Sequence, residues 1–70
     1  MKCRGIKEVL KNVKLNNVSV VYIADDAEKH VTEGLIRICE EKNIKIIHIN
    51  TMAELGKKAG IDVGTSCYAE

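Results

Sequence analysis

The sequence contains no phenylalanine or tryptophan, and its two aromatic residues are Tyr22 and Tyr68. A core for this chain must therefore be built from isoleucine, valine, leucine and alanine, with Met52 as filler. Hydrophobic residues nevertheless make up 46% of the sequence, so we expect a folded chain rather than a disordered one. Its 70 residues suffice for one small domain that spans 1–70.

The sequence also lacks a large net charge and any long hydrophobic run. Eleven basic residues stand against ten acidic ones, so bulk charge does not indicate a nucleic-acid partner. Any such partner would have to be held by local clusters of charge. The opening residues carry no apolar signal segment, and no stretch reaches the length of a membrane span. We therefore expect a cytoplasmic protein with no membrane partner.

The three cysteines, Cys3, Cys39 and Cys67, form no CxxC pair, and no Cys/His spacing matches a zinc site. Their odd number and wide spacing suit a reduced intracellular setting. His30 and His48 belong to no Ser/His/Asp or Cys/His arrangement that the spacing supports. The sequence thus predicts no catalytic residue, no metal site and no cofactor.

Hydrophobic periodicity predicts three helices that alternate with three strands. The expected helices cover roughly 6–15, 28–42 and 52–59, and the expected strands cover 18–24, 44–49 and 65–69. Asn16 and Asn43 end the first two helices, and Thr51 with Glu54 forms a capping box for the third. This alternation favours a three-layer α/β/α sandwich around a small mixed sheet, in the order α-β-α-β-α-β. A further strand expected before Gly5 is missing or cut short.

The segment 55–64 combines three glycines with Lys57 and Lys58. Such a glycine cluster usually marks backbone that turns sharply or approaches another group closely, and the lysines suggest that this group is a phosphate chain. A simpler interpretation makes Gly60 the C-cap of the third helix, where the lysines suit the helix dipole. The glycine patterns of nucleotide-binding loops are absent, so a nucleotide cradle has no support.

The first expected helix carries Lys7, Lys11 and Lys14 at intervals of four and three residues, away from its apolar stripe. Their ammonium groups could line an RNA backbone, and a helix that begins at a free glycine amide favours phosphate. An ordinary solvated lysine face would produce the same pattern. Both interpretations remain open on the spacing alone.

Asp25 and Asp26 follow the first expected strand, at the sheet edge where open α/β folds bind ligands. An acidic pair at this point can hold Mg²⁺, so a receiver-like phosphoacceptor domain is one alternative. Against it, the next strand ends at Asn50 rather than at an aspartate, and the chain is short for such a fold. Aspartates also suit a turn and a helix N-cap.

Four segments resemble the kink-turn RNA-binding family of ribosomal proteins of the L-seven-Ae and L-thirty-e type. They are G-I-K-E-V-L-K at 5–11, I-A-D-D-A at 23–27, C-E-E-K-N-I at 39–44 and L-G-K-K-A-G-I at 55–61. The likeness covers nearly the whole chain and is strongest to small bacterial members, although the helix and strand that precede the glycine in the family are lacking. It implies a non-enzymatic α/β/α protein that grips a kink-turn and its sheared G·A pairs, in ribosomal or another structured non-coding RNA.

The resemblance also implies which residues contact RNA. The start of the first helix would enter the widened groove, where Glu8 accepts from a guanine edge while Lys7 and Lys11 contact base edges or phosphate. The loop at 26–28 and the segment at 60–63 would flank the RNA. The segment at 60–63 would also supply apolar contact to extruded bases. The shortage of aromatics agrees, because a kink-turn is read by shape, groove edge and phosphate. The expected RNA-binding residues are Gly5, Lys7, Glu8, Lys11, Lys14, Asp26, Glu28, Gly60, Ile61, Asp62 and Val63.

A third alternative is a protein-interaction member of the same fold. A chain that lacks part of its sheet can complete it by pairing with a second copy through an open edge. We therefore keep a homodimer beside RNA and the ribosome among the expected partners.

Overall fold

The computed structural model describes residues 3–61 and 63–70. The elements in chain order are β1 (Cys3–Arg4), α1 (Ile6–Lys14), β2 (Val20–Ala24), α2 (Lys29–Glu41), β3 (Lys45–Ile49), α3 (Met52–Ala59) and β4 (Cys67–Ala69). The predicted order of helices and strands is confirmed, and the short β1 is added ahead of Gly5. The strand expected there is therefore present in shortened form. None of the helices in the described part of the chain is long and apolar enough to span a membrane.

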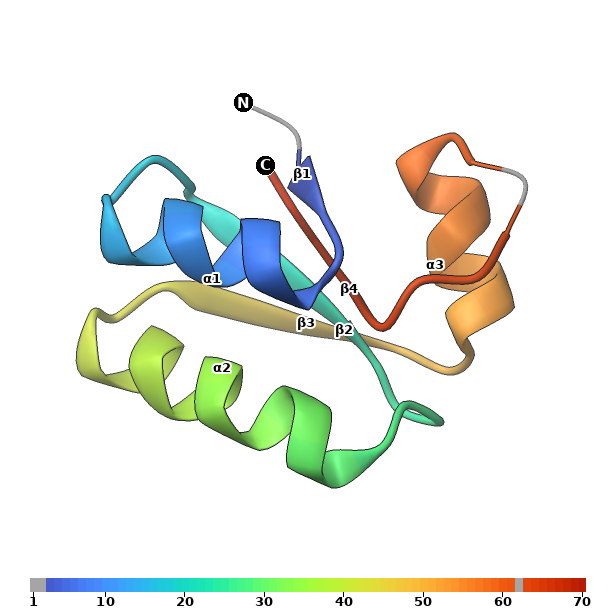
Figure 1. The fold of residues 1–70 in the computed structure, drawn as a ribbon, viewed down its shortest axis with the longest axis horizontal. Helices are drawn as coiled ribbons and strands as arrows, with labels where there is room; N and C mark the ends of the chain where they lie inside the picture. The colour runs from blue at the N-terminus through green and yellow to red at the C-terminus, as the bar shows by residue number, and fades with distance from the viewer. Residues whose placement is uncertain (1–2, 62) are drawn as a thin grey trace.

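The strands form one mixed sheet in the order β1-β4-β2-β3 (Figure 1). β2 and β3 run parallel, from Val20 opposite Lys45 to Ala24 opposite Ile49. β4 runs antiparallel to both β2 and β1, so it closes the other side of β2. Because parallel strands need a crossover, α2 carries the chain from the end of β2 back to the start of β3. β3 is left as an edge strand.

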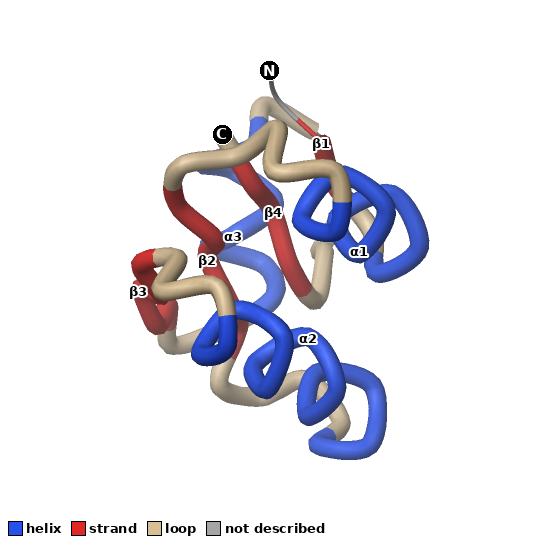
Figure 2. Tube along the Cα trace, turned by 90° about the vertical axis from the view of Figure 1, so that its left-hand side faces the viewer, coloured by secondary structure: helices blue, strands red, loops and turns tan. Residues whose placement is uncertain are grey.

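Different helices cover the two faces of this sheet, as Figure 2 shows for α1 and α2 on one side of the strands. Val21 and Ile23 of β2 point toward the face under α1 and α2, where Leu35 of α2 is fully buried. The alternate residue Tyr22 points to the opposite face and packs with Leu55 of α3. Residues alternate in this way because successive side chains of a strand leave opposite faces. The predicted three-layer sandwich is confirmed.

The composition of the core differs from the expectation, because both tyrosines belong to it. Tyr22 and Tyr68 lie opposite each other in the register of β2 and β4, with their stacked ring centroids 5.8 Å apart. Lys58 Nζ lies 4.5 Å from the centroid of the Tyr22 ring, and the Tyr22 hydroxyl donates to the Glu70 carboxylate at 3.1 Å. Met52, expected as core filler, is instead 37% exposed.

The predicted helix ends agree with the structure. Asn16 and Asn43 adopt positive φ angles of 59° and 58° directly after the C-cap residues of α1 and α2. Thr51 is the N-cap residue of α3, and its hydroxyl accepts from the Glu54 amide at 3.1 Å. The helix ends at Gly60, which takes the left-handed conformation with φ 79°.

Candidate nucleic-acid interface

Several segments that are distant in the sequence meet at one end of the sheet. α1 and α2 begin there, beside α3, at the end where β2 and β3 finish and β4 starts (Figure 1). The Gly5 amide donates to the Cys67 carbonyl at 3.3 Å, and the Ala24 amide donates to the Ser66 carbonyl at 3.0 Å. These backbone bonds join the start of α1, the end of β2 and the start of β4 into one unit.

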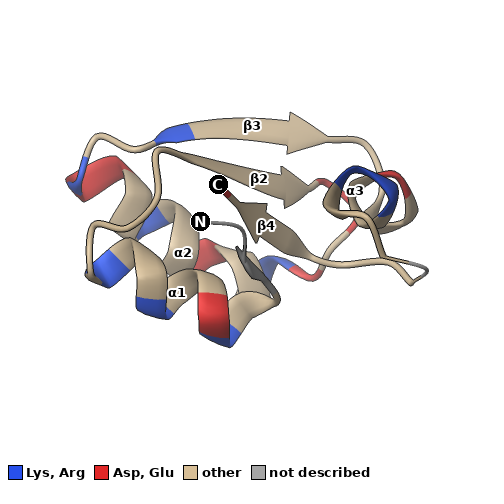
Figure 3. Ribbon diagram, turned by 90° about the horizontal axis from the view of Figure 1, so that it is seen from above, with Lys and Arg blue, Asp and Glu red and all other residues tan. Residues whose placement is uncertain are grey.

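α1 presents its expected basic residues to solvent along its outer surface. Lys7, Lys11 and Lys14 are all exposed, whereas Val9 and Val13 on the opposite side of the helix are fully buried. Basic positions therefore recur along the outer surface of α1 (Figure 3). With a rise of about 1.5 Å per residue, Lys14 lies about 10 Å further along the helix axis than Lys7. The lysines form a stripe that starts at the shared end and runs away from it.

The start of α1 combines a glycine with an exposed carboxylate. Gly5 has a φ of 88°, a conformation that L side chains rarely adopt, so glycine lets the chain turn from β1 into α1 without strain. Glu8 is exposed in the first helical turn, where a negative charge suits the helix dipole. Sequence reasoning missed Asn12, which is buried and donates from its side-chain amide to the Glu8 carbonyl at 2.8 Å. The available signal in the sequence was that Asn12 lies three residues after Val9, and therefore on the same side of the helix.

The acidic pair after β2 does not form one shared site, because each carboxylate has its own partner. Asp25 Oδ1 lies 2.9 Å from His48 Nδ1 on β3. Asp26 Oδ1 accepts from the backbone amide of Met52, the first residue of α3, at 2.7 Å. Within residues 3–61 and 63–70, no group of three His, Cys, Asp or Glu residues is placed to hold a metal ion. The arrangement gives the receiver-like alternative no support.

The sequence suggested that an aspartate of this loop caps the helix that follows it. In the structure, neither Asp25 nor Asp26 is the N-cap residue of α2. Glu28 is the N-cap residue of α2, and its exposed carboxylate lies 3.1 Å from His30 Nε2 rather than on the helix amides. Asp26 caps a helix, but that helix is α3 and not α2. The direct RNA contacts expected of Asp26 and Glu28 remain predictions.

The segment after α3 carries an exposed apolar side chain. Gly60 ends α3, and the Ile61 amide returns to the Gly56 carbonyl at 3.0 Å while its side chain is half-buried. Val63 is 69% exposed. The predicted contact at Asp62 lies outside the described residues. The start of α1 and the segment after α3 thus lie at the same end of the sheet (Figure 1).

The glycines of 55–64 allow this segment to lie directly against α3. A Cβ placed on Gly56 would collide with the Val63 carbonyl oxygen and would come within 3.0 Å of its carbonyl carbon. A Cβ on Gly64 would come within 3.1 Å of the Met52 Cβ. The Thr65 amide also donates to the Met52 carbonyl at 3.2 Å. The close approach that the glycine cluster predicted is therefore confirmed, with the chain's own backbone as the group approached.

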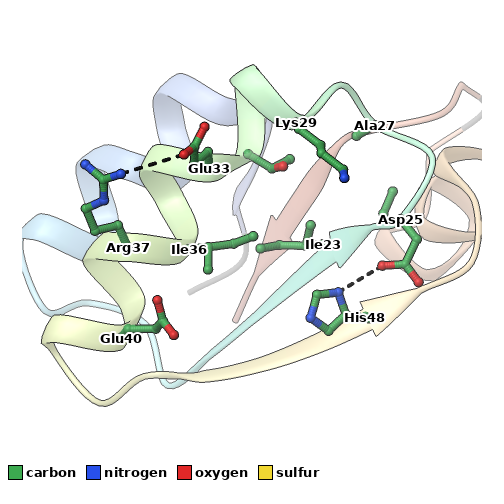
Figure 4. A pocket seen from close by; sticks show the side chains of 11 residues that line it. Ile23, Asp25, Ala27, Lys29, Glu33, Ile36, Arg37, Glu40 and His48 are labelled. Atoms are coloured by element: carbon green, nitrogen blue, oxygen red, sulfur yellow. Dashed lines mark hydrogen bonds and ion pairs between the residues drawn. The ribbon is translucent and has the colours of Figure 1, made fainter.

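A groove of about 510 Å³ lies on the side of β2 that faces α2, and sequence reasoning gave no sign of it. Ile23 forms part of its floor (Figure 4). Its rim carries the Arg37–Glu33 ion pair, at 3.7 Å, and the contact between His48 and Asp25. Because acidic and basic groups alternate around it, the rim favours no single sign of ligand charge.

Comparison with known proteins identifies the family. The model of the ribosomal protein L7Ae/L30e/S12e/Gadd45 family matches residues 3–70. The chain belongs to this family. The match confirms the resemblance seen in the four sequence segments, and it accounts for the α/β/α fold.

Relatives within this family share much of the sequence. An RNA-binding protein of Caldanaerobacter subterraneus is 52% identical over 66 residues, which cover 94% of this chain and 80% of that protein. The large ribosomal subunit protein eL8 of Halobacterium salinarum is 30% identical and is covered over 56% of its length. The solved structure of the Giardia lamblia 15.5kD RNA binding protein superposes with a TM-score of 0.90 at 29% identity, over 97% of this chain and 57% of that one. The chain thus spans little more than half of the last two proteins.

Proposed function

We propose that this chain is a non-enzymatic RNA-binding protein that recognises kink-turn RNA. The observation that carries the proposal is that two exposed segments lie at the same end of the sheet: the start of α1 and the segment that bears Val63 (Figure 1). Relatives named as RNA-binding proteins, and the ribosomal protein eL8, support a nucleic-acid partner. A kink-turn suits a site of this kind because its sharp bend exposes a groove edge, phosphates and extruded bases together.

The α1 surface supplies polar contacts. Glu8 is exposed in the first turn, where its carboxylate accepts from a guanine edge of the sheared pairs. Lys7 is exposed next to it and donates to base edges or phosphate. Lys11 and Lys14 continue the positive surface along the helix and contact the RNA backbone. Gly5 brings the RNA close to the first amides of α1, where the helix dipole favours phosphate.

The segment 60–64 supplies apolar contact on the other side of the site. Val63 is 69% exposed, and a base that leaves the helical stack of a kink-turn can cover it. Ile61, in the same segment, is half-buried. Gly60 belongs to the same segment, and the RNA contacts at Asp62 and Glu28 are part of the proposal on the strength of the family resemblance alone.

The proposal also predicts a modest dependence on salt. The chain has a formal net charge of +1, and only a few lysines face the RNA in the proposed complex. The logarithm of the binding constant should therefore fall with the logarithm of the salt concentration with a slope of only about −2 to −4, because each neutralised phosphate contributes about −0.7 to −0.9. The protein would act in the cytoplasm, on ribosomal RNA or on another structured RNA.

A band-shift titration tests the proposal, with a kink-turn RNA and a control whose G·A pairs are replaced by Watson–Crick pairs. The kink-turn should bind at a much lower protein concentration than the control. K11A should weaken this binding, whereas K45A should not, because Lys45 begins β3 at the opposite end of the sheet. Equal binding of both RNAs, or of neither, would reject kink-turn recognition.

Self-association is a second candidate, favoured by the free edge of β3. Among the strands of the described residues, in the order β1-β4-β2-β3, β3 pairs with β2 alone, and its Ile46, Ile47 and Ile49 are only half-buried. Exposed Lys45 and His48 oppose the pairing of two such edges. Light scattering coupled to size-exclusion chromatography decides between the states, and a monomer at the concentrations used for RNA binding would reject the dimer.

A further inference from the structure

Asp26 makes a contact whose position in the fold suggests a specific task. Its Oδ1 accepts from the Met52 amide at 2.7 Å, across 26 positions of sequence. Met52 is the first residue of α3, and the first amides of a helix have no partner within the helix. Thr51 satisfies the Glu54 amide in the same turn at 3.1 Å. The start of α3 is therefore capped twice, once by its own N-cap residue and once by the loop after β2.

Met52 links this cap to the segment that bears Val63. Its amide is held by Asp26, while its carbonyl accepts from the Thr65 amide at 3.2 Å. Gly64 packs so closely on it that an added Cβ would lie 3.1 Å from the Met52 Cβ. A displacement of the first turn of α3 is therefore transmitted to 63–65 through direct backbone contacts.

We propose that Asp26 is a positioning residue of the RNA site, which fixes the segment at Val63 through α3 instead of contacting RNA itself. This inference rests on the proposed function for its RNA readout, and it replaces the direct contact that the family resemblance implies. The charge of Asp26 agrees with it. At the start of α3 its carboxylate accepts from the Met52 amide and faces the positive end of a helix dipole.

Paired substitutions separate positioning from direct contact. D26N keeps a side-chain oxygen that can accept from the Met52 amide, so it should bind a kink-turn within about twofold of the parent. D26A removes the acceptor and should weaken binding roughly fivefold to tenfold, the change that ~1.0–1.4 kcal/mol produces. D25A is the matched control, because Asp25 faces His48 rather than α3, and it should leave affinity unchanged. Tighter binding by D26A would overturn the proposal.

A double-mutant cycle with Val63 tests whether Asp26 acts through the segment. If it does, D26A should cost much less affinity in a V63A background than in the parent, because the misplaced side chain is already absent. In a K11A background, the cost of D26A should be unchanged. Additive losses in both backgrounds would contradict the proposal, since general destabilisation affects both equally.

NMR spectra of the RNA-free protein make the test independent of RNA binding. D26A should shift the amide resonances of Met52 and of Val63 to Thr65, and it should accelerate hydrogen exchange at the Met52 amide. In D26N, most of these resonances and the exchange rate should stay close to those of the parent protein, and D25A should change none of them. If these shifts occur while no kink-turn binds the parent, the proposed function fails and positioning stands. If D26A leaves these resonances unchanged, the positioning role of Asp26 is refuted, whatever the RNA-binding assay shows.

Discussion

Replacing Gly56 with alanine places one methyl group where α3 touches the segment that bears Val63. The added Cβ would collide with the Val63 carbonyl oxygen and would lie 3.1 Å from the Gly64 Cα. Both neighbours are backbone atoms, so no side-chain rotation relieves the contact, and the segment must move away from the helix. Gly34 in α2 provides a matched control, because it is an exposed helical glycine whose added Cβ meets nothing within 4 Å.

The two substitutions should change the free energy of unfolding in opposite directions. Alanine is a better helix former than glycine, so G34A should stabilise the protein by about 0.5–1 kcal/mol. G56A gains the same stabilisation from helix propensity, but it also adds an overpacked contact that costs about 1–3 kcal/mol. The difference between the variants isolates this contact at roughly 1–3 kcal/mol. For a domain of this size, each 1 kcal/mol moves the melting temperature by roughly 4–8 °C.

Urea and thermal unfolding followed by circular dichroism measure this difference, and the kink-turn band shift measures its consequence. G56A should unfold more readily than G34A and should bind RNA more weakly, because the segment at Val63 has moved. G34A should bind as the parent does. If G56A proved as stable as G34A and bound RNA normally, the close packing of this segment on α3 would be refuted.

Three further outcomes follow from the contacts around the core and on α1. Mutating Lys7 to alanine should reduce the salt slope of RNA binding by about 0.9, whereas the same change at Lys45 should leave the slope unchanged. Y22F removes the hydrogen bond to Glu70 and keeps the ring, so urea unfolding should show a loss of about 0.5–1.5 kcal/mol. Burial raises the pKa of the Cys39 thiol, so mass spectrometry should find it alkylated by iodoacetamide only after unfolding. Because this thiol ionises first in the unfolded chain, its contribution to stability should be complete below the ordinary thiol pKa and should decline at higher pH.

Local pattern was sufficient to predict most of the fold. The apolar stripe on α1 and the near-continuous apolar run of β2 identified these elements, and the capping threonine identified the start of α3. These features could be predicted because each is encoded within a few adjacent residues. β1 is different: it consists of two residues that are strand only through pairing with Tyr68 and Ala69 of β4. No pattern in the residues next to β1 in the sequence encodes its pairing with β4.

The contacts around the proposed site could not be predicted from the sequence. Asp26 could be assigned to the loop after β2, yet its partner at Met52 is distant in sequence and is set by the fold. Gly34 and Gly56 are both helical glycines, and only the position of Val63 and Gly64 distinguishes open space from a close contact. Tyr22 likewise became a core residue because β4 places Tyr68 beside it.

Mapping the RNA contact by NMR tests the central claim most directly. A titration of the labelled protein with a kink-turn RNA should shift the backbone amides of 5–8 at the start of α1 and of 63–65 beside α3. The amides at the start of β3, near Lys45, should not move, and the G·A-disrupted RNA should cause no comparable change. Shifts centred on the groove between α2 and β3, or an equal response to both RNAs, would contradict the account.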